Sequence, residues 1–235
     1  MAGERLADLQ RFYDILDRLE RRLGGMLTLE TCSRRAMLPS RGVYFFFESG
    51  EIRRESGEGP RVVRIGTHAL SPTSRTTLRE RLYQHRGNAG DRNGNHRGSV
   101  FRNHVGMALL ESDDGIVCPT WGCGNSASAE IRAGERQLEI RVSAVIGAMP
   151  FLWLEVDGDE GAAQRSYVER QSIGLLSNFA REGLDGASAE WLGHRSRSPR
   201  VRESGLWNSN HVSEHHAPEF LDRLATLASA MPRAA

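Results

Sequence analysis

The chain has 235 residues, of which 39% are hydrophobic and 26% charged, and its formal net charge is +1. This length suits one large domain or one domain with terminal additions, and the apolar content suffices for a core without disulfides or metals. The net charge excludes a global basic field for nucleic acid, although local basic patches stay open. All 31 basic residues are Arg, which fits GC-rich coding and also suits bidentate phosphate binding.

No segment is long and apolar enough to span a membrane, because Pro150 interrupts the longest apolar stretch, VSAVIGAMPFLWLEV. The N-terminus is charged from its start and lacks the apolar run of a secretory signal. The only cysteines are Cys32, Cys118 and Cys123, too few for a disulfide framework. We therefore expect a cytoplasmic protein with reduced thiols.

The first half of the chain alternates helical and strand patterns. Apolar residues at three- and four-residue steps from Leu6 to Leu23 predict an amphipathic helix that ends at Gly24-Gly25. Two strands follow, over 42–48 and 61–67, joined by a polar connection rich in Gly. Thr76-Thr77 can then cap a helix that runs to Gly87.

The second half is mainly helical. Residues 86–99 are rich in Gly and Asn and are expected to form a flexible insert without a hydrophobic anchor. Residues 195–203 are polar, basic and interrupted by Pro199. Helices are predicted over 100–111, 126–149, 160–178 and 218–230, and a buried strand over 151–156. The order predicts an α/β (α+β) layer fold with a small three-stranded, antiparallel-type sheet flanked by helices.

Three motifs stand in this order along the chain. Gly42-Val43-Tyr44 opens the first strand, and Arg64-Ile65-Gly66 lies in the second. In the helix TLRERLYQHRG, Arg81 and His85 are one turn apart and face the same way. The later helical segment QRSYVERQSIGLLSN supplies Glu169. This arrangement resembles the GIY-YIG nuclease superfamily.

The resemblance implies a domain organisation. Residues 41–180 would form the GIY-YIG-like nuclease core, with insertions near 86–99 and 112–128. Residues 1–40 would be an N-terminal helical extension, and residues 181–235 a basic loop with a C-terminal helix.

The resemblance also implies a metal-dependent endonuclease in which Tyr44 is the general base. A free phenol titrates near pH ~10, so cations or hydrogen bonds must assist it. Arg81 and Arg64 would hold the scissile phosphate, and His85 would take the phenolic proton or form a hydrogen bond with the phenol. Glu169 would bind Mg²⁺ or Mn²⁺ together with waters and a substrate phosphate. Without this context, the Tyr, Arg and His would be an ordinary strand aromatic, a solvated side chain and a packing residue.

The chain departs from the family pattern at two positions. Arg64 stands where the second Tyr is expected, and Thr67-His68 occupy the region of a common Lys. These departures leave two alternatives open: a catalytically inactive nucleic-acid-binding module, and a protein-interaction module that uses the terminal helices.

Nucleic acid, DNA above all, is the expected partner, and a homodimer would suit a symmetric cutter. Candidate contacts to nucleic acid are Arg86, Arg97, Asn178, Arg200, Arg202, Asn208 and His211. The alternatives are solvated basic loops, a helix-ending Asn178, and a Trp207 that anchors the C-terminal segment. Cys118 and Cys123 could also bind zinc with His96 or His104, although a second Cys pair is missing.

Overall fold

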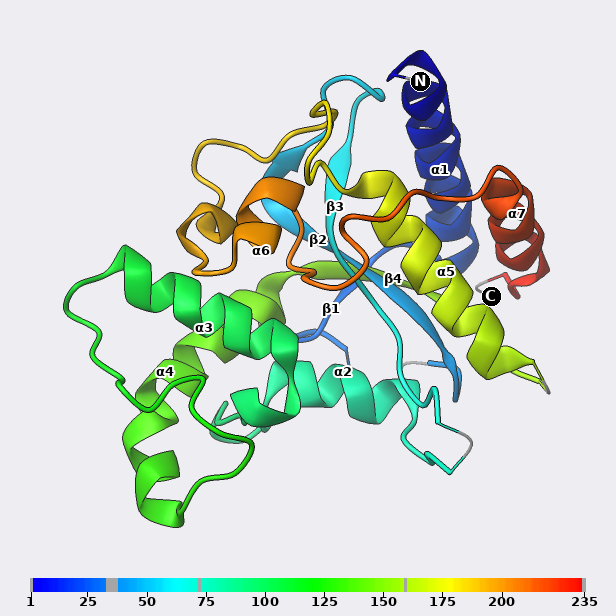
Figure 1. The fold of residues 1–235 in the computed structure, drawn as a ribbon. Coiled ribbons are helices and arrows are strands. Elements are labelled where there is room, and N and C mark those ends of the chain that lie inside the picture. The colour runs from blue at the N-terminus through cyan, green and yellow to red at the C-terminus, as the bar shows by residue number, and fades with distance from the viewer. Residues whose placement is uncertain (1, 33–37, 72, 159, 234–235) are drawn as a thin grey trace.

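A four-stranded antiparallel sheet with the strand order β1-β4-β2-β3 forms the centre of the protein (Figure 1). The computed structural model describes residues 2–32, 38–71, 73–158 and 160–233. The strands are β1 (Leu27–Thr28), β2 (Gly42–Ile52), β3 (Pro60–Gly66) and β4 (Pro150–Glu155). The predicted α/β class is confirmed and all three predicted strands are present. The additional strand, β1, has two residues, which is too short to show a periodic pattern.

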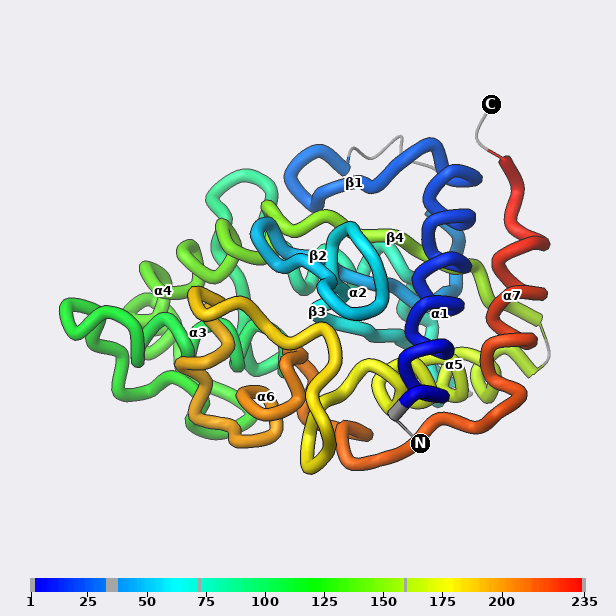
Figure 2. The backbone as a smooth tube through the Cα atoms, turned by 90° about the horizontal axis from the view of Figure 1, so that it is seen from above, coloured from blue at the N-terminus to red at the C-terminus, as the bar shows by residue number. Residues whose placement is uncertain are grey.

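Helices cover both sides of the sheet. Helices α1 and α7 lie next to each other on one side, and α3 and α4 lie on the other (Figure 2), where α2 packs against α4. None of the helices in the described part of the chain has the length and apolar character of a membrane span. The helices are α1 (Ala2–Leu23), α2 (Leu78–Arg86), α3 (Val100–Ser112), α4 (Ala129–Ala148), α5 (Gly161–Leu176), α6 (Pro199–Ser204) and α7 (Phe220–Ala230), with 3₁₀ helices η1 (His96–Gly98) and η2 (Leu192–Arg195).

The unbroken apolar run of β2 is explained by burial of both of its faces. Side chains alternate across a strand. The Phe45 ring packs against Phe12 of α1 with 6.0 Å between centroids, whereas Phe46 packs against Phe101 of α3 at 5.6 Å. The N-terminal helix therefore contributes to the same core as the sheet.

The expectation of a flexible insert over residues 86–99 is wrong. The His96 side chain is 1% exposed, and its Nδ1 lies 2.9 Å from Glu139 Oε1 on α4. The Trp121 ring stacks on His96 with 3.9 Å between centroids, and the Gly122 N–H donates to His96 Nε2 at 3.1 Å. This anchor consists of a polar pair and an aromatic stack, which a hydrophobic pattern in the sequence does not reveal.

A fully buried Arg102 joins α2, α3 and α4. Its guanidinium donates to Glu139 Oε2 at 2.5 and 3.0 Å, to the His85 carbonyl at 2.7 Å and to Ser143 Oγ at 3.0 Å. Breaking a buried pair of this kind by removing one partner typically costs about 3–5 kcal/mol, because the other charge is left without compensation. The network fixes the end of α2 relative to the two following helices.

The C-terminal segment covers the edge of β3. The Trp207 N–H donates to the Val63 carbonyl at 2.7 Å, and the Asn208 side chain bonds both the N–H and the carbonyl of Ile65. Covering an edge strand in this way blocks pairing with other chains. The interpretation of 195–203 as a loop interrupted by Pro199 is wrong in part, because Pro199 begins α6, a position where its missing N–H costs nothing.

The Asp185 carboxylate joins the segment that precedes α6 to the β2–β3 hairpin. Asp185 Oδ1 accepts backbone hydrogen bonds from Arg54, Glu55 and Ser56 at 2.9, 2.9 and 3.1 Å, and Oδ2 accepts one from the Ser56 hydroxyl. Burial raises the pKa of the Asp185 carboxyl, but the hydrogen bonds from Ser56 and from the backbone lower it by a larger amount. The pKa therefore lies below its ordinary value.

The substitution Asp185→Asn should lower the free energy of unfolding by about 1–3 kcal/mol. The amide replaces one accepting oxygen by an NH₂ group, which cannot accept a hydrogen bond from the donors of residues 54–56. Urea unfolding measures this loss. The matched control is Asp114→Asn at an exposed position, which should stay within about 0.5 kcal/mol of the wild type.

The difference in stability between the wild type and Asp185→Asn should also depend on pH. Since the folded pKa of Asp185 is depressed, its contribution is present above the unfolded pKa of ~3.9 and is lost as the pH falls through the folded pKa. The stability difference between the wild type and Asp185→Asn should therefore be largest near neutral pH and shrink in acid. A difference that stays constant down to the acid transition would contradict this assignment.

Candidate active site

The register between β2 and β3 brings two of the predicted site residues to one face of the sheet. Tyr44 pairs with Gly66, and Phe46 pairs with Arg64. Directly paired residues of antiparallel strands point to the same face. Tyr44 and Arg64 consequently share the face that α2 and α3 cover.

Gly66 is required by close contact with Tyr44. The Tyr44 ring lies across Gly66, so a Cβ at that position would be 2.6 Å from Tyr44 Cε2 and closer still to the phenol oxygen. Ordinary Cβ contacts lie beyond about 3.4 Å. The glycine that ends the second motif therefore makes room for the tyrosine that ends the first.

His85 is hydrogen-bonded on both sides of its ring. Its Nε2 lies 2.7 Å from the Tyr44 hydroxyl, and its Nδ1 lies 2.8 Å from Ser99 Oγ. Helix α2 presents His85 to the sheet together with Leu78 and Leu82. Burial first, and then the charges of nearby arginines, hold the pKa of His85 well below its usual value. The imidazole is neutral near pH 7 as a result.

Two arginines lie beside this pair. Arg81 Nη1 donates to Gln84 Oε1 at 3.0 Å and to the Gly98 carbonyl at 3.1 Å. Arg64 Nη1 donates to the Trp207 carbonyl at 2.7 Å. Within the described residues, the buried Nε atoms of both arginines have no hydrogen-bond partner. Both guanidinium groups thus keep an Nε donor that no group of the described residues uses.

Glu169 of α5 completes the cluster. Burial raises the pKa of its carboxyl above the ordinary value, against the charges of Arg64, His211 and Arg81 and a hydrogen bond from the Thr67 backbone. Burial also lowers the pKa of Arg64, with opposing effects from Tyr44 and Glu169. The phenol, two guanidinium groups and the carboxylate are therefore close enough to influence one another.

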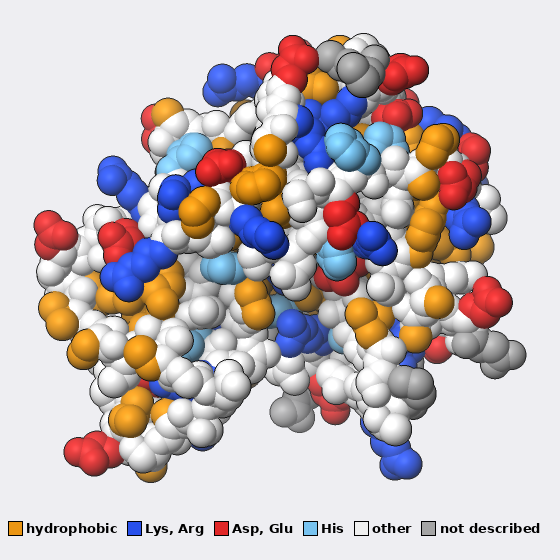
Figure 3. Space-filling model, viewed as in Figure 1, with side chains coloured by type: hydrophobic (Ala, Val, Ile, Leu, Met, Phe, Trp, Pro, Cys, Tyr) orange, Lys and Arg blue, Asp and Glu red, His pale blue; other side chains and the backbone are white. Residues whose placement is uncertain are grey.

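The face of the molecule that Figure 3 presents is hollowed near its middle. Figure 3 shows Arg and His side chains, in blue and pale blue, lining a hollow near the middle of the face presented in Figure 1, between the lobe of α3 and α4 and the lower end of α5. The contacts and charge interactions bring Tyr44, Arg64, Arg81, His85 and Glu169 into one neighbourhood, in which Arg81 and Glu169 are partly exposed and Tyr44 and His85 are buried.

Glu169 supplies the carboxylate of this cluster that a divalent cation could bind. No group of three or more His, Cys, Asp or Glu side chains in the described parts of the chain is arranged to hold a metal ion. A single carboxylate fits Mg²⁺, which keeps several waters and takes further oxygens from a substrate phosphate. The raised pKa of Glu169 indicates a carboxylate with incomplete charge compensation, and a cation would supply the missing charge.

Three of the predicted nucleic-acid contacts are used inside the fold. The Arg97 side chain is 3% exposed and binds both carboxylate oxygens of Glu135 at 2.6 and 2.7 Å. Asn208 is buried against Ile65. Asn178 Oδ1 accepts from Arg5 at 2.8 Å and from the Leu184 N–H at 3.0 Å. As they stand, these side chains support the fold and are not free to contact a ligand.

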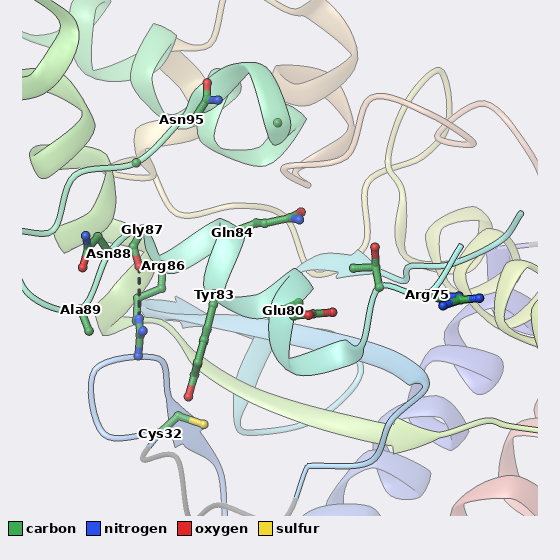
Figure 4. A pocket seen from close by; sticks show the side chains of 13 residues that line it. Cys32, Arg75, Glu80, Tyr83, Gln84, Arg86, Gly87, Asn88, Ala89 and Asn95 are labelled. Carbon is green, nitrogen blue, oxygen red and sulfur yellow. Dashed lines mark hydrogen bonds between the residues drawn. The ribbon is translucent and has the colours of Figure 1, made fainter. Parts of the chain in front are cut away.

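The other predicted contacts lie in different places. Arg86 stacks on the Tyr83 ring at 3.9 Å in a groove beside α2 (Figure 4), and His85 is not among the residues that line this groove. Arg200 and Arg202 are exposed on α6, and each donates one hydrogen bond to a backbone carbonyl. His211 lies next to Glu169, close enough for its charge to lower the pKa of that carboxyl.

Two residues near the cluster were not singled out as catalytic by the sequence. Ser99, the N-cap of α3, contacts His85. His104 lies on α3 beside Arg64; burial first, then that charge, lowers the pKa of His104 to about 4. A Ser before a helix is a common N-cap, but nothing in the sequence links this helix to Tyr44.

The zinc alternative gains no support in the described residues. Cys118 and Cys123 are free thiols. His96 Nε2 accepts the Gly122 N–H, and His96 Nδ1 faces Glu139, so neither ring nitrogen is available as a ligand.

The substitution Gly66→Ala should lower the free energy of unfolding by about 1–3 kcal/mol, because the new methyl group displaces the buried Tyr44 ring. Chemical unfolding measures the effect. In the control Gly134→Ala on α4, the added Cβ meets nothing within 4 Å, and helix propensity favours a gain of up to about 1 kcal/mol. Equal stability of the two variants would show that the Tyr44 contact is not restrictive.

Comparison with known proteins agrees with this arrangement. A family model with the description GIY-YIG domain matches residues 3–233 of the chain. No curated protein and no solved structure matches the chain. Since the match covers nearly the whole sequence and the motif residues lie together, the chain belongs to the GIY-YIG domain family.

Proposed function

We propose that this protein is a divalent-metal-dependent endonuclease that hydrolyses phosphodiester bonds in nucleic acid, with DNA as its substrate. The observation that carries the proposal is the Tyr44–His85 hydrogen bond of 2.7 Å next to Arg64, Arg81 and Glu169. The family is generally one of nucleases, which makes nucleic acid the substrate class.

Tyr44 is the proposed general base. Its oxygen, as a phenolate, takes a proton from the water that attacks the phosphorus. The depressed pKa of His85 argues against His85 as the final proton acceptor, because an imidazolium would be buried among arginines. His85 instead remains neutral and orients the Tyr44 oxygen by a hydrogen bond.

Arg64 and Arg81 are the proposed phosphate ligands. Their Nε donors have no partner within the described residues, and guanidinium groups bind phosphate oxygens in pairs. Positive charge at these positions stabilises the additional negative charge of the transition state. Arg64 stands where the family pattern has its second Tyr, so in this chain a permanent cation would replace a phenol.

Glu169 is the proposed metal ligand, for Mg²⁺ or Mn²⁺. When bound, the cation would stabilise negative charge on the leaving 3′-oxygen. Residues of the protein would bind the phosphate, orient the attacking water and accept its proton.

The three free thiols support a reducing compartment, and we propose a cytoplasmic location. Cleavage of both strands of a duplex target with two-fold symmetry would require two copies of the chain, one for each strand.

The test compares plasmid cleavage in Mg²⁺ by the wild type, Tyr44→Phe and Glu169→Gln. Each substitution should slow cleavage by about 10²-fold or more, since each removes a group that acts in the chemical step. The control Glu155→Gln changes an exposed carboxylate at the end of β4 and should cut like the wild type.

Two results would count against the assigned roles. Equal cutting by all variants would remove Tyr44 and Glu169 from the mechanism. DNA binding that persists in EDTA, without cleavage under any divalent metal, would indicate the inactive binding module instead.

A further inference from the structure

A groove with a volume of about 1070 Å³ lies beside α2 (Figure 4). None of the residues that line it belongs to the candidate active site. They come from the segment before α2, from α2 itself and from residues 87–98. The polar side chains of the groove include two arginines and three amides, which are Arg75, Arg86, Gln84, Asn88 and Asn95.

The three amides use their oxygen atoms within the protein. Asn88 Oδ1 accepts the backbone N–H two residues later at 2.9 Å, and Asn95 Oδ1 does the same at 3.1 Å. Gln84 Oε1 accepts from Arg81 Nη1 at 3.0 Å. Because a donor fixes each oxygen, the NH₂ group is the other end of each amide. No hydrogen bond to a described residue engages these three NH₂ groups.

The two arginines add further donors and positive charge. The Arg86 guanidinium stacks on the Tyr83 ring at 3.9 Å, and both side chains leave α2 toward Cys32 (Figure 4). The Arg86 Nε donates to the carbonyl of the next residue at 3.3 Å. Its two terminal NH₂ groups have no hydrogen-bond partner in the described parts of the chain. Arg75 is exposed and is likewise without a hydrogen bond to those parts.

Glu80 is the one carboxylate among the described residues that line the groove. Its Oε2 accepts from the Thr77 N–H at 2.7 Å and from the Thr77 hydroxyl at 3.0 Å, as part of the capping box of α2. The groove therefore presents mainly donors. A ligand that fits it must be rich in acceptors and negatively charged, and the phosphate backbone of nucleic acid has both properties.

The groove adjoins a proposed phosphate ligand. Arg81 Nη1 donates to Gln84 Oε1 at 3.0 Å and to the Gly98 carbonyl at 3.1 Å, and both acceptors belong to residues that line the groove. A strand whose scissile phosphate is bound by Arg81 would therefore have neighbouring nucleotides at this wall. An acidic segment of a protein would match the charge of the groove, but it gives no reason for the groove to adjoin Arg81.

We propose that this groove binds the nucleic-acid strand that the protein cuts, on one side of the scissile phosphate. Arg75 and Arg86 contact phosphates of the flanking nucleotides, and the amide NH₂ groups donate to phosphate oxygens or to acceptors on base edges. This assignment rests on the proposed function, because it places the scissile phosphate at Arg81. The groove residues supply affinity and take no part in the chemical step.

The first test removes positive charge from the groove. Fluorescence anisotropy of a labelled DNA duplex in EDTA measures binding by the full-length protein without cleavage. Arg75→Gln/Arg86→Gln should weaken binding by about 10-fold, and should reduce the slope of log K against log salt by about 1.8, since each lost phosphate contact removes about 0.9. Arg86→Lys keeps the charge and should keep the salt slope of the wild type.

The control for the first test is Arg18→Gln/Arg21→Gln. Both arginines are exposed on α1, which lies on the other side of the sheet from α3 and α4 (Figure 2). The control removes the same amount of charge from the protein and should bind DNA like the wild type. Thermal unfolding of both double variants checks that neither has lost stability.

The second test changes donors without changing size. Asn88→Asp and Asn95→Asp keep the oxygen that accepts the local backbone N–H, and Asp forms the same kind of turn as Asn. Each replaces an NH₂ donor with a charged oxygen and should weaken DNA binding by about 5-fold or more, because like charges repel. The control Asn125→Asp makes the same change at an exposed position outside the groove and should bind like the wild type.

Two results would overturn the assignment of the groove. One is DNA binding by the groove variants that equals the binding of their controls. The other is a wild type that binds labelled poly-glutamate but no DNA, which would assign the groove to an acidic protein segment. The nuclease assignment is decided separately: a wild type that binds DNA through the groove but cleaves none in Mg²⁺ leaves the groove in place and removes the nuclease.

Discussion

The close approach of Tyr44 to Gly66 is the constraint on which the site depends. With a Cβ at residue 66 the phenol could not lie across β3. In this position its hydroxyl reaches His85, which α2 carries, at 2.7 Å. The strand register, the glycine and the orientation of the helix are therefore parts of one requirement, which is to place the buried Tyr44 hydroxyl against His85.

Segments distant in the sequence hold this arrangement in place. Arg102, seventeen residues after His85, fixes the end of α2 through the His85 carbonyl and Glu139. The Trp207 carbonyl, 143 residues after Arg64, receives its guanidinium. Helix α3, which carries Arg102, and the C-terminal segment consequently belong to the structure of the site, since removing either would release a group beside Tyr44.

Several features followed from the sequence by short-range physics. The capping box of Thr77 and Glu80 begins α2, and the four-residue spacing put Arg81 and His85 on neighbouring turns. Gly66 was recognisable from its motif. Helices and strands of adequate length were predictable to within a few residues, because periodicity and caps depend on neighbours in the chain. The two-residue strand β1 was not.

The sequence by itself determined the elements, their order and the residue types available for chemistry. The tertiary structure decided which polar groups are free: Arg97 is held by Glu135 and Asn208 by Ile65, although each looked available for nucleic acid. It also decided that Ser99 contacts His85. The reason is that a hydrogen bond between distant residues depends on strand register and helix packing, which no local pattern encodes.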